Sequence, residues 1–468
     1  MSLLPKTPSL QSDLSPEERL ARVNSITSGL ELNDDKLKYI MNLLETEFNQ
    51  GLSNENDATI KMLLTYVRDI PKGNEVGMYM ALDLGGTNFR VLTVALDGSR
   101  ASIDTETCEI PAKVMIGSGR DLFDRIADCV YMFIRSRNIT VPVLPIGFTF
   151  SFPLRQEGLA SAKLIRWTKG FKCTDVVGAD VVALLRESLE KRKGDCKVKC
   201  EVVAVINDTT GTLMSCAHRN RECRVGLIVG TGTNLCYMEK LSRIPKWKPP
   251  KGDDEKPRIA VNCEWGAFGD NGVLNEILTD FDRQVDANSL NQGMQIFEKL
   301  ISGMYLGELA RLVLLHLHRQ DLLCPGVPVP SMLVVKGGFS AKHLSRIASR
   351  REDSIYKVFT KIETKDFDSV DVDIVKHVCD LVAERASRLV AAGLSVVLNR
   401  LGREKKTTIG YDGSVMRFHP FFRKRVEQKI KDLCRFPFDL MLSEDGSGRG
   451  AALVAAIACK NFDPKMKI

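Results

Sequence analysis

The sequence predicts an α/β protein built from two domains, and three observations support this. The chain has 468 residues, more than a single hydrophobic core usually holds. Short apolar segments of strand length are mixed with longer amphipathic segments of helix length along the whole chain, which is typical of the α/β class. The tripeptide Gly-Thr-Asn occurs twice, at 86–88 and 232–234, each time between two apolar segments that read as paired strands.

The predicted elements follow in chain order from these patterns. Residues 1–17 are expected to be a disordered tail, and helices are expected at about 18–32, 34–50 and 56–68. The first helix has a capping box in Ser15-Pro-Glu-Glu18 at its start. The remaining expected elements are two or three strands within 78–110, helix 119–137, strands 143–150 and 201–207, helix 208–219, strands within 225–238, a Pro/Lys/Asp-rich loop at 241–258, strand 332–336, and helices 293–319, 341–351, 372–400, 420–433 and 448–459.

Composition excludes several classes of function. The 66 basic residues are dispersed among 59 acidic ones, so the net charge of +7 makes no nucleic-acid footprint. No apolar run approaches about 20 residues, and the N-terminus is too polar for a signal peptide. The 13 cysteines are odd in number and contain no Cys-x-x-Cys pair. We therefore expect reduced thiols in a cytoplasmic protein with no stable membrane insertion.

The two Gly-Thr-Asn turns are the first candidate site. In the first, Asp83 ends one strand and Arg90 lies on the returning strand; the second runs from Gly230 to Asn234. Turns rich in glycine can point several N–H groups at an anion. Two such turns, one in each half of the chain, could clamp a polyphosphate, and the alternative is two ordinary hairpins.

A candidate general base lies at the end of the predicted strand 201–207. Asp208 follows Asn207 at the carboxyl end of that strand, directly before a helix. This is where open α/β sheets bind ligands, and a carboxylate there can take a proton from a hydroxyl nucleophile. The alternative is that Asp208 is a plain helix N-cap.

Three further segments carry polar groups that suit a polyol. An apolar strand ends at Ser151, and 166–169 is Arg-Trp-Thr-Lys. Glu264 lies beside Trp265, and Glu298 lies among apolar neighbours, where a buried carboxylate needs hydrogen-bond donors. The alternatives are a surface loop for 166–169 and a solvated helical side chain for Glu298.

Two Gly/Ser turns complete the set. They are 412–414, Asp-Gly-Ser, and 443–450, Ser-Glu-Asp-Gly-Ser-Gly-Arg-Gly. The second opens a predicted helix, and a helix N-terminus behind such a turn can bind an anion.

Taken together, these segments closely resemble the hexokinase family, in the family's order, from about residue 47 to residue 459. The resemblance matches one unit of about 50 kDa. It implies an actin-like ATPase (ribonuclease H-like) fold with a cleft between two domains. It also implies transfer of the ATP γ-phosphoryl group to the 6-hydroxyl of glucose, mannose or fructose, the first step of glycolysis.

The resemblance also implies roles for particular residues. Asp208 and Lys169 would be catalytic, with Asp208 as the base. The implied sugar ligands are Ser151, Thr168, Lys169, Asn207, Asp208, Asn234, Glu264 and Glu298. The implied ATP-binding residues are Asp83, Gly85, Gly86, Thr87, Asn88, Arg90, Gly230, Thr231, Gly232, Asp412, Gly413, Ser414 and Ser447. Asp83 would act on Mg²⁺ through water.

The expected domain division is a tail at 1–17, a small domain at 74–208 plus 448–468, and a large domain at 18–73 plus 209–447. The sugar ligands fall on both sides of this division, so hexose is expected to close the cleft. Hexose 6-phosphate is expected to inhibit by competing with ATP. Two rival interpretations are a catalytically inactive sugar sensor of the same fold and an actin- or chaperone-type ATPase. The second should lack the set formed by Ser151, residues 167–169 and Glu264.

Overall fold

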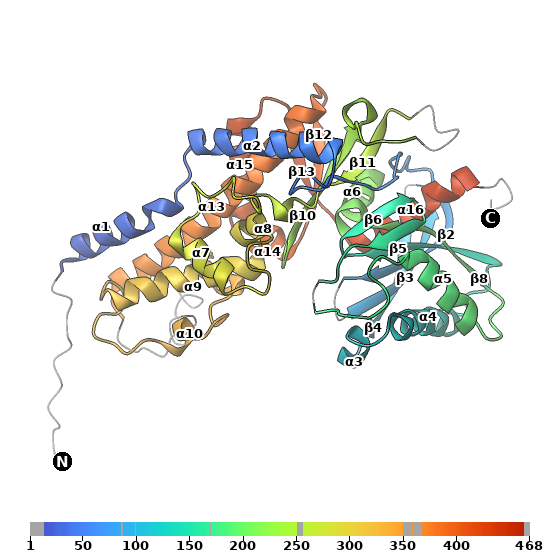
Figure 1. Cartoon of the computed structure of the whole chain (residues 1–468), viewed down its shortest axis with the longest axis horizontal. Helices are drawn as coiled ribbons and strands as arrows, with labels where there is room; N and C mark the ends of the chain where they lie inside the picture. Colours follow the sequence, from blue (N-terminus) through green and yellow to red (C-terminus); the bar gives the residue numbers. More distant parts are fainter. Residues whose placement is uncertain are drawn as a thin grey trace, which may run out of the picture.

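The computed structural model describes residues 14–85, 88–98, 100–168, 170–249, 256–349, 358 and 367–462, with the side chains of 460–462 excepted. Figure 1 shows an elongated molecule, with two sheets toward one end and long helices forming the other. No helix in these ranges is both long and apolar enough to cross a membrane.

The five-stranded sheet has the order β4-β3-β2-β5-β8. The first three strands form an antiparallel meander, and β5 and β8 add to it in parallel beside β2. The strands are β2 Val76–Leu84, β3 Asn88–Asp97, β4 Arg100–Glu109, β5 Val143–Phe150 and β8 Lys199–Ile206. The predicted strand 143–150 is confirmed, and the region 78–110 contains three strands.

The six-stranded sheet repeats this pattern in the order β1-β11-β10-β9-β12-β13. Again an antiparallel meander, β9-β10-β11, is followed by two parallel strands beside its first strand. The strands are β1 Leu63–Leu64, β9 Cys223–Val229, β10 Thr233–Lys240, β11 Arg258–Asn262, β12 Thr407–Asp412 and β13 Phe438–Leu442. A two-stranded ribbon of β6 Leu154–Gly158 and β7 Ser161–Leu164 is separate from both sheets.

Two helices stand in matching places. Helix α6, Asp208–Arg219, follows β8, and helix α16, Gly446–Phe462, follows β13. They pack against each other, α6 also against β9 and α16 also against β2 and β5. Their buried faces contribute to a hydrophobic cluster with residues of both sheets. The carboxyl ends of β8 and β13 are therefore brought together at one region of the molecule.

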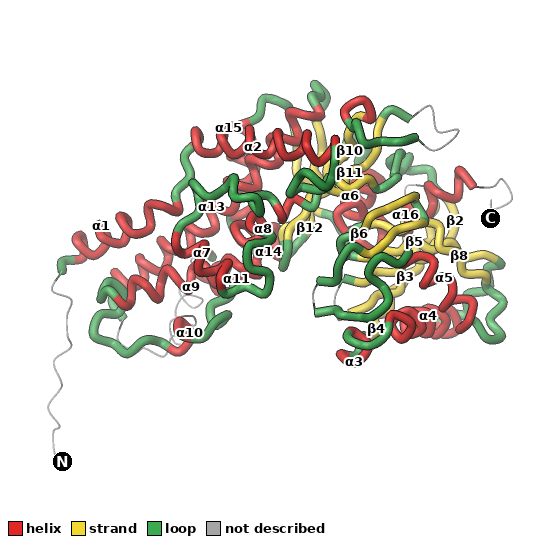
Figure 2. Tube along the Cα trace, in the orientation of Figure 1, coloured by secondary structure: helices red, strands yellow, loops and turns green. Residues whose placement is uncertain are grey.

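The other helices surround these sheets or build the end far from them, where Figure 2 shows helices and loops without strands. On the five-stranded sheet lie α3 Ala112–Met115, α4 Gly119–Ser136 and α5 Val181–Arg192. The others are α1 Pro16–Thr27, α2 Asp34–Ser53, α7 Asp280–Ala287, α8 Ile296–Ile301, α9 Gly303–Arg319, α10 Ser331–Val334, α11 Ala341–Ala348, α13 Ser369–Leu401, α14 Ser414–Phe418 and α15 Phe422–Leu433. Single turns of 3₁₀ helix occur at Ser28–Leu30, Leu241–Arg243 and Trp265–Ala267.

Several expected elements differ from the structure. Helix α1 begins at Pro16, capped by Ser15, so its first turn lies inside the stretch expected to be a tail, of which 1–13 fall outside the described residues. The expected helix 56–68 is wrong: Met62 and Tyr66 have positive φ, and the two residues of β1 pair with β11 instead. The expected strand 332–336 is wrong too, because 331–334 forms the short helix α10.

The expected helix 293–319 is two helices. Ser302 has extended backbone (φ −90°, ψ 152°) between α8 and α9. The first two amides of α9 then point outward: Gly303 N–H donates to Gly230 O at 2.7 Å, and Met304 N–H donates to Thr231 O at 3.2 Å. The break therefore fastens α9 to the second Gly-Thr-Asn turn, a tertiary contact that helical periodicity does not reveal.

Candidate functional site

The first hairpin joins β2 to β3 and places two opposite charges side by side. Asp83 and Arg90 are directly paired across the two strands. Arg90 donates to Asp83 Oδ2 from Nη2 at 2.6 Å and from Nε at 3.2 Å. Gly85 and Asn88 flank the turn, and the predicted residues Gly86 and Thr87 lie outside the described residues. Hydrogen bonds to Oδ2 thus hold the Asp83 carboxylate in place.

The start of α16 meets this hairpin. Ser447 Oγ donates to Asp83 Oδ2 at 2.7 Å, and Arg90 Nη2 donates to Ser447 Oγ at 2.9 Å. Arg90 Nη1 also forms an ion pair with Asp445 at 2.7 Å. The structure therefore brings Asp83, Arg90 and Ser447 together, although 357 residues separate the last two. The segment Gly446–Gly450, expected to be a turn, is the first part of α16.

The second hairpin, between β9 and β10, meets the Asp412–Ser414 turn in a similar way. A Cβ added to Gly230 would lie 3.2 Å from Gly413 Cα, so the two backbones touch. Gly413 has φ 102°, and a Cβ on it would lie 2.4 Å from Val229 O. Only glycine fits such a position without strain. Thr231 and Gly232 belong to the same turn, and Ser414 begins the short helix α14.

Asparagine side chains organise the edge of the sheet where β10 begins and β11 ends. Asn234 Nδ2 lies 2.7 Å from Asn262 Oδ1 and 3.1 Å from Glu264 Oε1. Asn262 Nδ2 donates to the same Oε1 at 2.8 Å. The Glu264 backbone is left-handed (φ 55°, ψ 45°), and its N–H donates to Asn234 Oδ1 at 3.0 Å. A left-handed backbone conformation costs about 1–3 kcal/mol of conformational free energy in a residue other than glycine. Residues with such strained backbones cluster at functional sites.

Asp208 is not the N-cap of α6. The cap is Asn207, whose Oδ1 accepts from Thr209 N–H at 2.9 Å. Asp208 is the first helical residue instead. The N-cap alternative for Asp208 is therefore wrong, and its carboxylate belongs to the first turn of the helix.

Two neighbouring carboxylates act on Glu264. Part of the Glu264 residue is exposed, yet its carboxyl group is desolvated, which raises its pKa. The Asn262 hydrogen bond lowers that pKa, whereas the negative charges of Asp208 and Glu298 raise it further. Sugar hydroxyls are donors that such a cluster can bind. Within the described ranges, no three His, Cys, Asp or Glu side chains form a group that could hold a metal ion.

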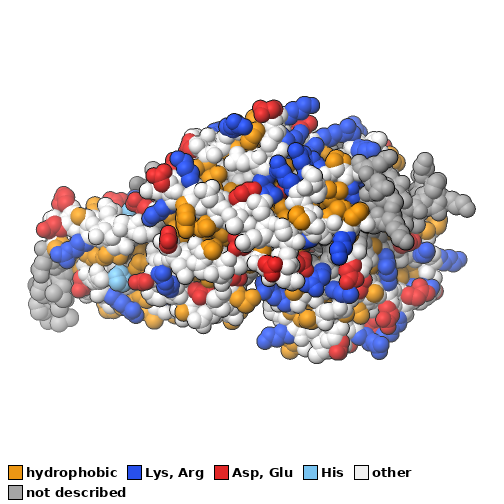
Figure 3. Space-filling model, turned by 45° about the horizontal axis from the view of Figure 1, so that its top comes forward, with side chains coloured by type: hydrophobic (Ala, Val, Ile, Leu, Met, Phe, Trp, Pro, Cys, Tyr) orange, Lys and Arg blue, Asp and Glu red, His pale blue; other side chains and the backbone are white. Residues whose placement is uncertain are grey.

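Ser151 and Thr168 come from the side of the five-stranded sheet. Ser151 follows β5, is buried, and donates its N–H to Leu84 O at 3.1 Å, close to Asp83. Thr168 lies in a loop after β7, and Lys169 lies outside the described residues. Trp167 belongs to the aromatic cluster beneath that loop and donates from Nε1 to Cys173 O at 2.9 Å. The predicted sugar ligands therefore come from the sides of two sheets, and the molecular surface is indented between its two lobes (Figure 3).

Sequence reasoning assigned no role to Asn262, Thr233 or Asp445. Asn262 is the last residue of β11 and lies two residues before Glu264, close enough in sequence for its amide to reach the Glu264 carboxylate. That spacing is the signal that could have identified it. The roles of Thr233 and Asp445 depend on Trp265, Glu298 and Arg90, which lie far from them in sequence.

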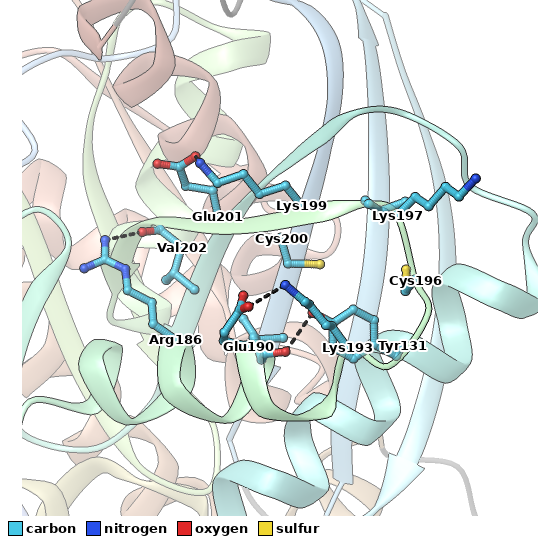
Figure 4. A pocket seen from close by; sticks show the side chains of 12 residues that line it. Tyr131, Arg186, Glu190, Lys193, Cys196, Lys197, Lys199, Cys200, Glu201 and Val202 are labelled. Atoms are coloured by element: carbon cyan, nitrogen blue, oxygen red, sulfur yellow. Dashed lines mark hydrogen bonds and ion pairs between the residues drawn. The ribbon is translucent and has the colours of Figure 1, made fainter.

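A cavity elsewhere on the molecule is a weaker candidate. It has a volume of about 320 Å³ and lies between α5 and β8 (Figure 4). Four of its charged side chains form ion pairs with one another: Lys193 pairs with Glu190, and Lys199 Nζ lies 3.3 Å from Glu201 Oε2. None of the predicted site residues lines it.

Comparisons with known proteins point to one family. Two family models described as hexokinase match residues 22–218 and 224–457. Hexokinase-1 of Rattus norvegicus is 41% identical over 459 residues, 94% of this chain and 48% of that protein. Hexokinase-2 of Homo sapiens is 42% identical over 444 residues, 92% of this chain and 47% of that protein. The chain thus spans about half the length of the curated relatives it matches.

Solved structures give the same result. A hexokinase from Schistosoma mansoni complexed with glucose superposes with a TM-score of 0.86 at 39% identity, covering 95% of this chain and 100% of that one. A second crystal structure of a hexokinase gives a TM-score of 0.81 at 30% identity, covering 94% and 100%.

Proposed function

Because the chain belongs to the hexokinase family, we propose that it transfers the γ-phosphoryl group of ATP to the 6-hydroxyl of glucose and related hexoses. The fold is of the actin-like ATPase type, as the repeated sheet pattern indicates. The observation that carries the proposal is the position of Asp208. Asp208 is the first residue of α6 but does not cap the helix. Its negative charge lies close enough to Glu264 to raise the pKa of the Glu264 carboxyl group.

On the sugar side, donors and acceptors of both sheets hold the hexose. Hydrogen bonds to the hexose hydroxyls come from the side of the six-stranded sheet through Asn234, Glu264 and Glu298. They come from the other side through Ser151, Thr168 and Lys169. The network around Asn234 supports this, because it fixes the Glu264 carboxylate before a ligand arrives. A preorganised acceptor loses little entropy when it binds a hydroxyl.

On the nucleotide side, the two Gly/Thr turns and the Asp412–Ser414 turn cradle the phosphates of ATP. Among the described residues, the Asp83 hydrogen bonds fall on Oδ2. Oδ1 is then the oxygen suited to a water of Mg²⁺, which prefers oxygen ligands and keeps several waters. When bound, the ion would neutralise charge on the β- and γ-phosphates.

The chemical step needs positioning more than covalent chemistry. Asp208 accepts the proton of the hexose 6-hydroxyl while the hydroxyl oxygen attacks the γ-phosphorus of ATP. The bond from that phosphorus to ADP breaks, and ADP leaves. Lys169 and the turn amides stabilise the charge that spreads over the transferred oxygens. Closure of the two sides excludes water, which would otherwise take the phosphoryl group. We propose 74–208 plus 448–468 and 18–73 plus 209–447 as the closing units.

A coupled assay tests this proposal. Glucose, mannose and fructose are each supplied with Mg²⁺-ATP, and hexose 6-phosphate is measured with an EDTA control. We expect hexose-dependent product that EDTA abolishes. Glucose binding without product for any of the hexoses would favour the alternative, a catalytically inactive sugar sensor.

Hexose 6-phosphate is proposed to inhibit by competing with ATP. A phosphate on the 6-oxygen occupies the volume and the charge position of the γ-phosphate. Arg90 and Ser447 meet at the start of α16 and offer a cation and a hydroxyl to either group. We expect competitive inhibition against ATP, weakened several-fold in Ser447→Ala, in initial-rate kinetics. No inhibition at millimolar product, or competition with glucose alone, would contradict this.

A further inference from the structure

Thr233 is the place where the two halves of the proposed site make contact. It is the first residue of β10 and directly follows the Gly230–Gly232 turn. Its Oγ1 accepts from Trp265 Nε1 at 3.0 Å and donates to Ile228 O at 2.9 Å. Its backbone N–H donates to Glu298 Oε2 at 2.9 Å. Thr233 and Trp265 are both buried, so little water competes for these bonds.

The Glu298 carboxylate lies directly against the Gly230–Gly232 turn. A Cβ on Gly232 would lie 2.7 Å from Glu298 Oε2, closer than real Cβ atoms approach an oxygen. The carboxylate therefore rests directly on the turn. On the turn's other side, α9 donates to Gly230 O and Thr231 O. A shift of Glu298 would alter its hydrogen bond to the Thr233 amide, at the residue that directly follows the turn.

Trp265 supplies the second connection. It follows Glu264 directly, is fully buried, and packs edge-on against Phe297, the neighbour of Glu298. A sugar that engages Glu264 and Glu298 would therefore fix both partners of Thr233 at once. A nucleotide that engages the turn amides would fix the same residue from the opposite side.

We propose that Thr233 is a positioning residue that couples hexose binding to nucleotide binding. This rests on the proposed function. Bound hexose fixes the positions of Glu298 and the Trp265 indole. Their hydrogen bonds to the Thr233 amide and hydroxyl then fix the position of the phosphate-binding turn. By reciprocity, ATP strengthens hexose binding by the same factor.

The experiment measures that factor. Titration calorimetry gives the Kd of the non-hydrolysable analogue AMP-PNP with Mg²⁺, with and without saturating glucose. We expect glucose to tighten AMP-PNP binding by about tenfold in the wild type. Thr233→Val removes the hydroxyl but keeps the branched shape and the amide. It should lower the factor to about twofold to threefold, because the amide contact with Glu298 remains, while glucose binding alone changes little.

Three variants make the result decisive. Thr233→Ser keeps the hydroxyl and should restore coupling. Thr233→Cys carries a weaker hydrogen-bond acceptor and should give an intermediate coupling factor. The cysteine variant replaces the valine variant if the latter does not fold. The matched control is Thr27→Val. Thr27 is also buried, and its Oγ1 donates to Val23 O at 2.9 Å, but it lies in α1. Thr27→Val should keep wild-type coupling.

The outcomes separate two failures. Absence of hexose 6-phosphate formation by the wild type refutes the proposed function. Equal coupling in the wild type and in Thr233→Val overturns the role of Thr233, as does a wild type in which glucose leaves AMP-PNP affinity unchanged.

Discussion

Asn207 and Asp208 divide two tasks between adjacent residues. Asn207 uses its side chain to cap α6. Asp208 is thereby released from the capping role and directs a carboxylate from the first turn of the helix. The proposed role as base requires this carboxylate to be ionised when the hexose is bound. An ionised carboxylate is the form that can accept a hydroxyl proton.

We therefore expect Asp208→Ala to lower kcat by about 10²–10⁴. Glucose affinity should change much less, since Asn234, Glu264 and Glu298 remain. The coupled assay gives kcat, and tryptophan fluorescence gives the glucose Kd. Asn207→Ala is the contrasting variant, expected to cost about 1 kcal/mol of stability through loss of the cap. A near-normal kcat in Asp208→Ala would show that another group is the base.

The pH dependence of hexose binding should report on Glu264. Desolvation, with help from Asp208 and Glu298, raises the pKa of Glu264 above its ordinary value. Hydroxyl donors bind the carboxylate, not the acid. Affinity should therefore be present above this raised pKa and should be lost as the pH falls through it, earlier than for an ordinary glutamate. Glucose Kd against pH measures this, and Glu264→Gln, which does not titrate, should bind more weakly without that pH dependence.

At the scale of elements, the contact between α6 and α16 depends on glycine. Gly211 and Gly450 face each other so closely that a Cβ on Gly450 would lie 2.2 Å from Gly211 O. A Cβ on Gly147 would similarly lie 2.1 Å from Ala451 O. These close approaches allow α16 to pack on both α6 and the five-stranded sheet. They also fix the position of Ser447, in the first turn of α16.

Gly450→Ala should therefore destabilise the protein by about 1–3 kcal/mol, because a methyl group is forced against backbone. Catalysis should fall as well, since Ser447 would move relative to Asp83. Urea unfolding followed by circular dichroism measures the first effect, and ATP KM the second. Gly158→Ala is the control: nothing lies within 4 Å of its Cβ position, and its φ is not positive. Equal stability of the two variants would contradict the role of the helix contact.

At the scale of the whole molecule, the proposed sugar ligands are divided between two cores. One hydrophobic cluster underlies the five-stranded sheet, and another underlies the helices around α13. A third cluster, with α6 and α16, lies between them. Two bodies joined through a packed helix pair can rotate relative to each other while each core stays intact, which is the usual basis of domain closure.

Glucose should accordingly reduce the radius of gyration. Ser151 and Thr168 approach the hexose from one body, and Asn234, Glu264 and Glu298 approach it from the other. Small-angle scattering with saturating D-glucose measures the effect, with L-glucose as the matched control. Trp167 and Trp265 adjoin these ligands, so intrinsic fluorescence should change in parallel. An unchanged radius with D-glucose would indicate a preformed site.

The sequence by itself determined the α/β class, the order of the local motifs and the identity of most proposed site residues. It did so because turn glycines, strand ends and helix caps act over a few neighbouring residues. Helices α4 and α6 and strand β5 were predicted within a residue for that reason.

Only the tertiary structure decided the rest. The break at Ser302, the extended segment around β1 and the left-handed backbone of Glu264 are set by hydrogen bonds to distant strands and turns. The meeting of Arg90 with Ser447, and of Thr233 with Trp265 and Glu298, likewise depends on packing. Such contacts join residues separated by tens to hundreds of positions, and no local pattern in a single sequence encodes them.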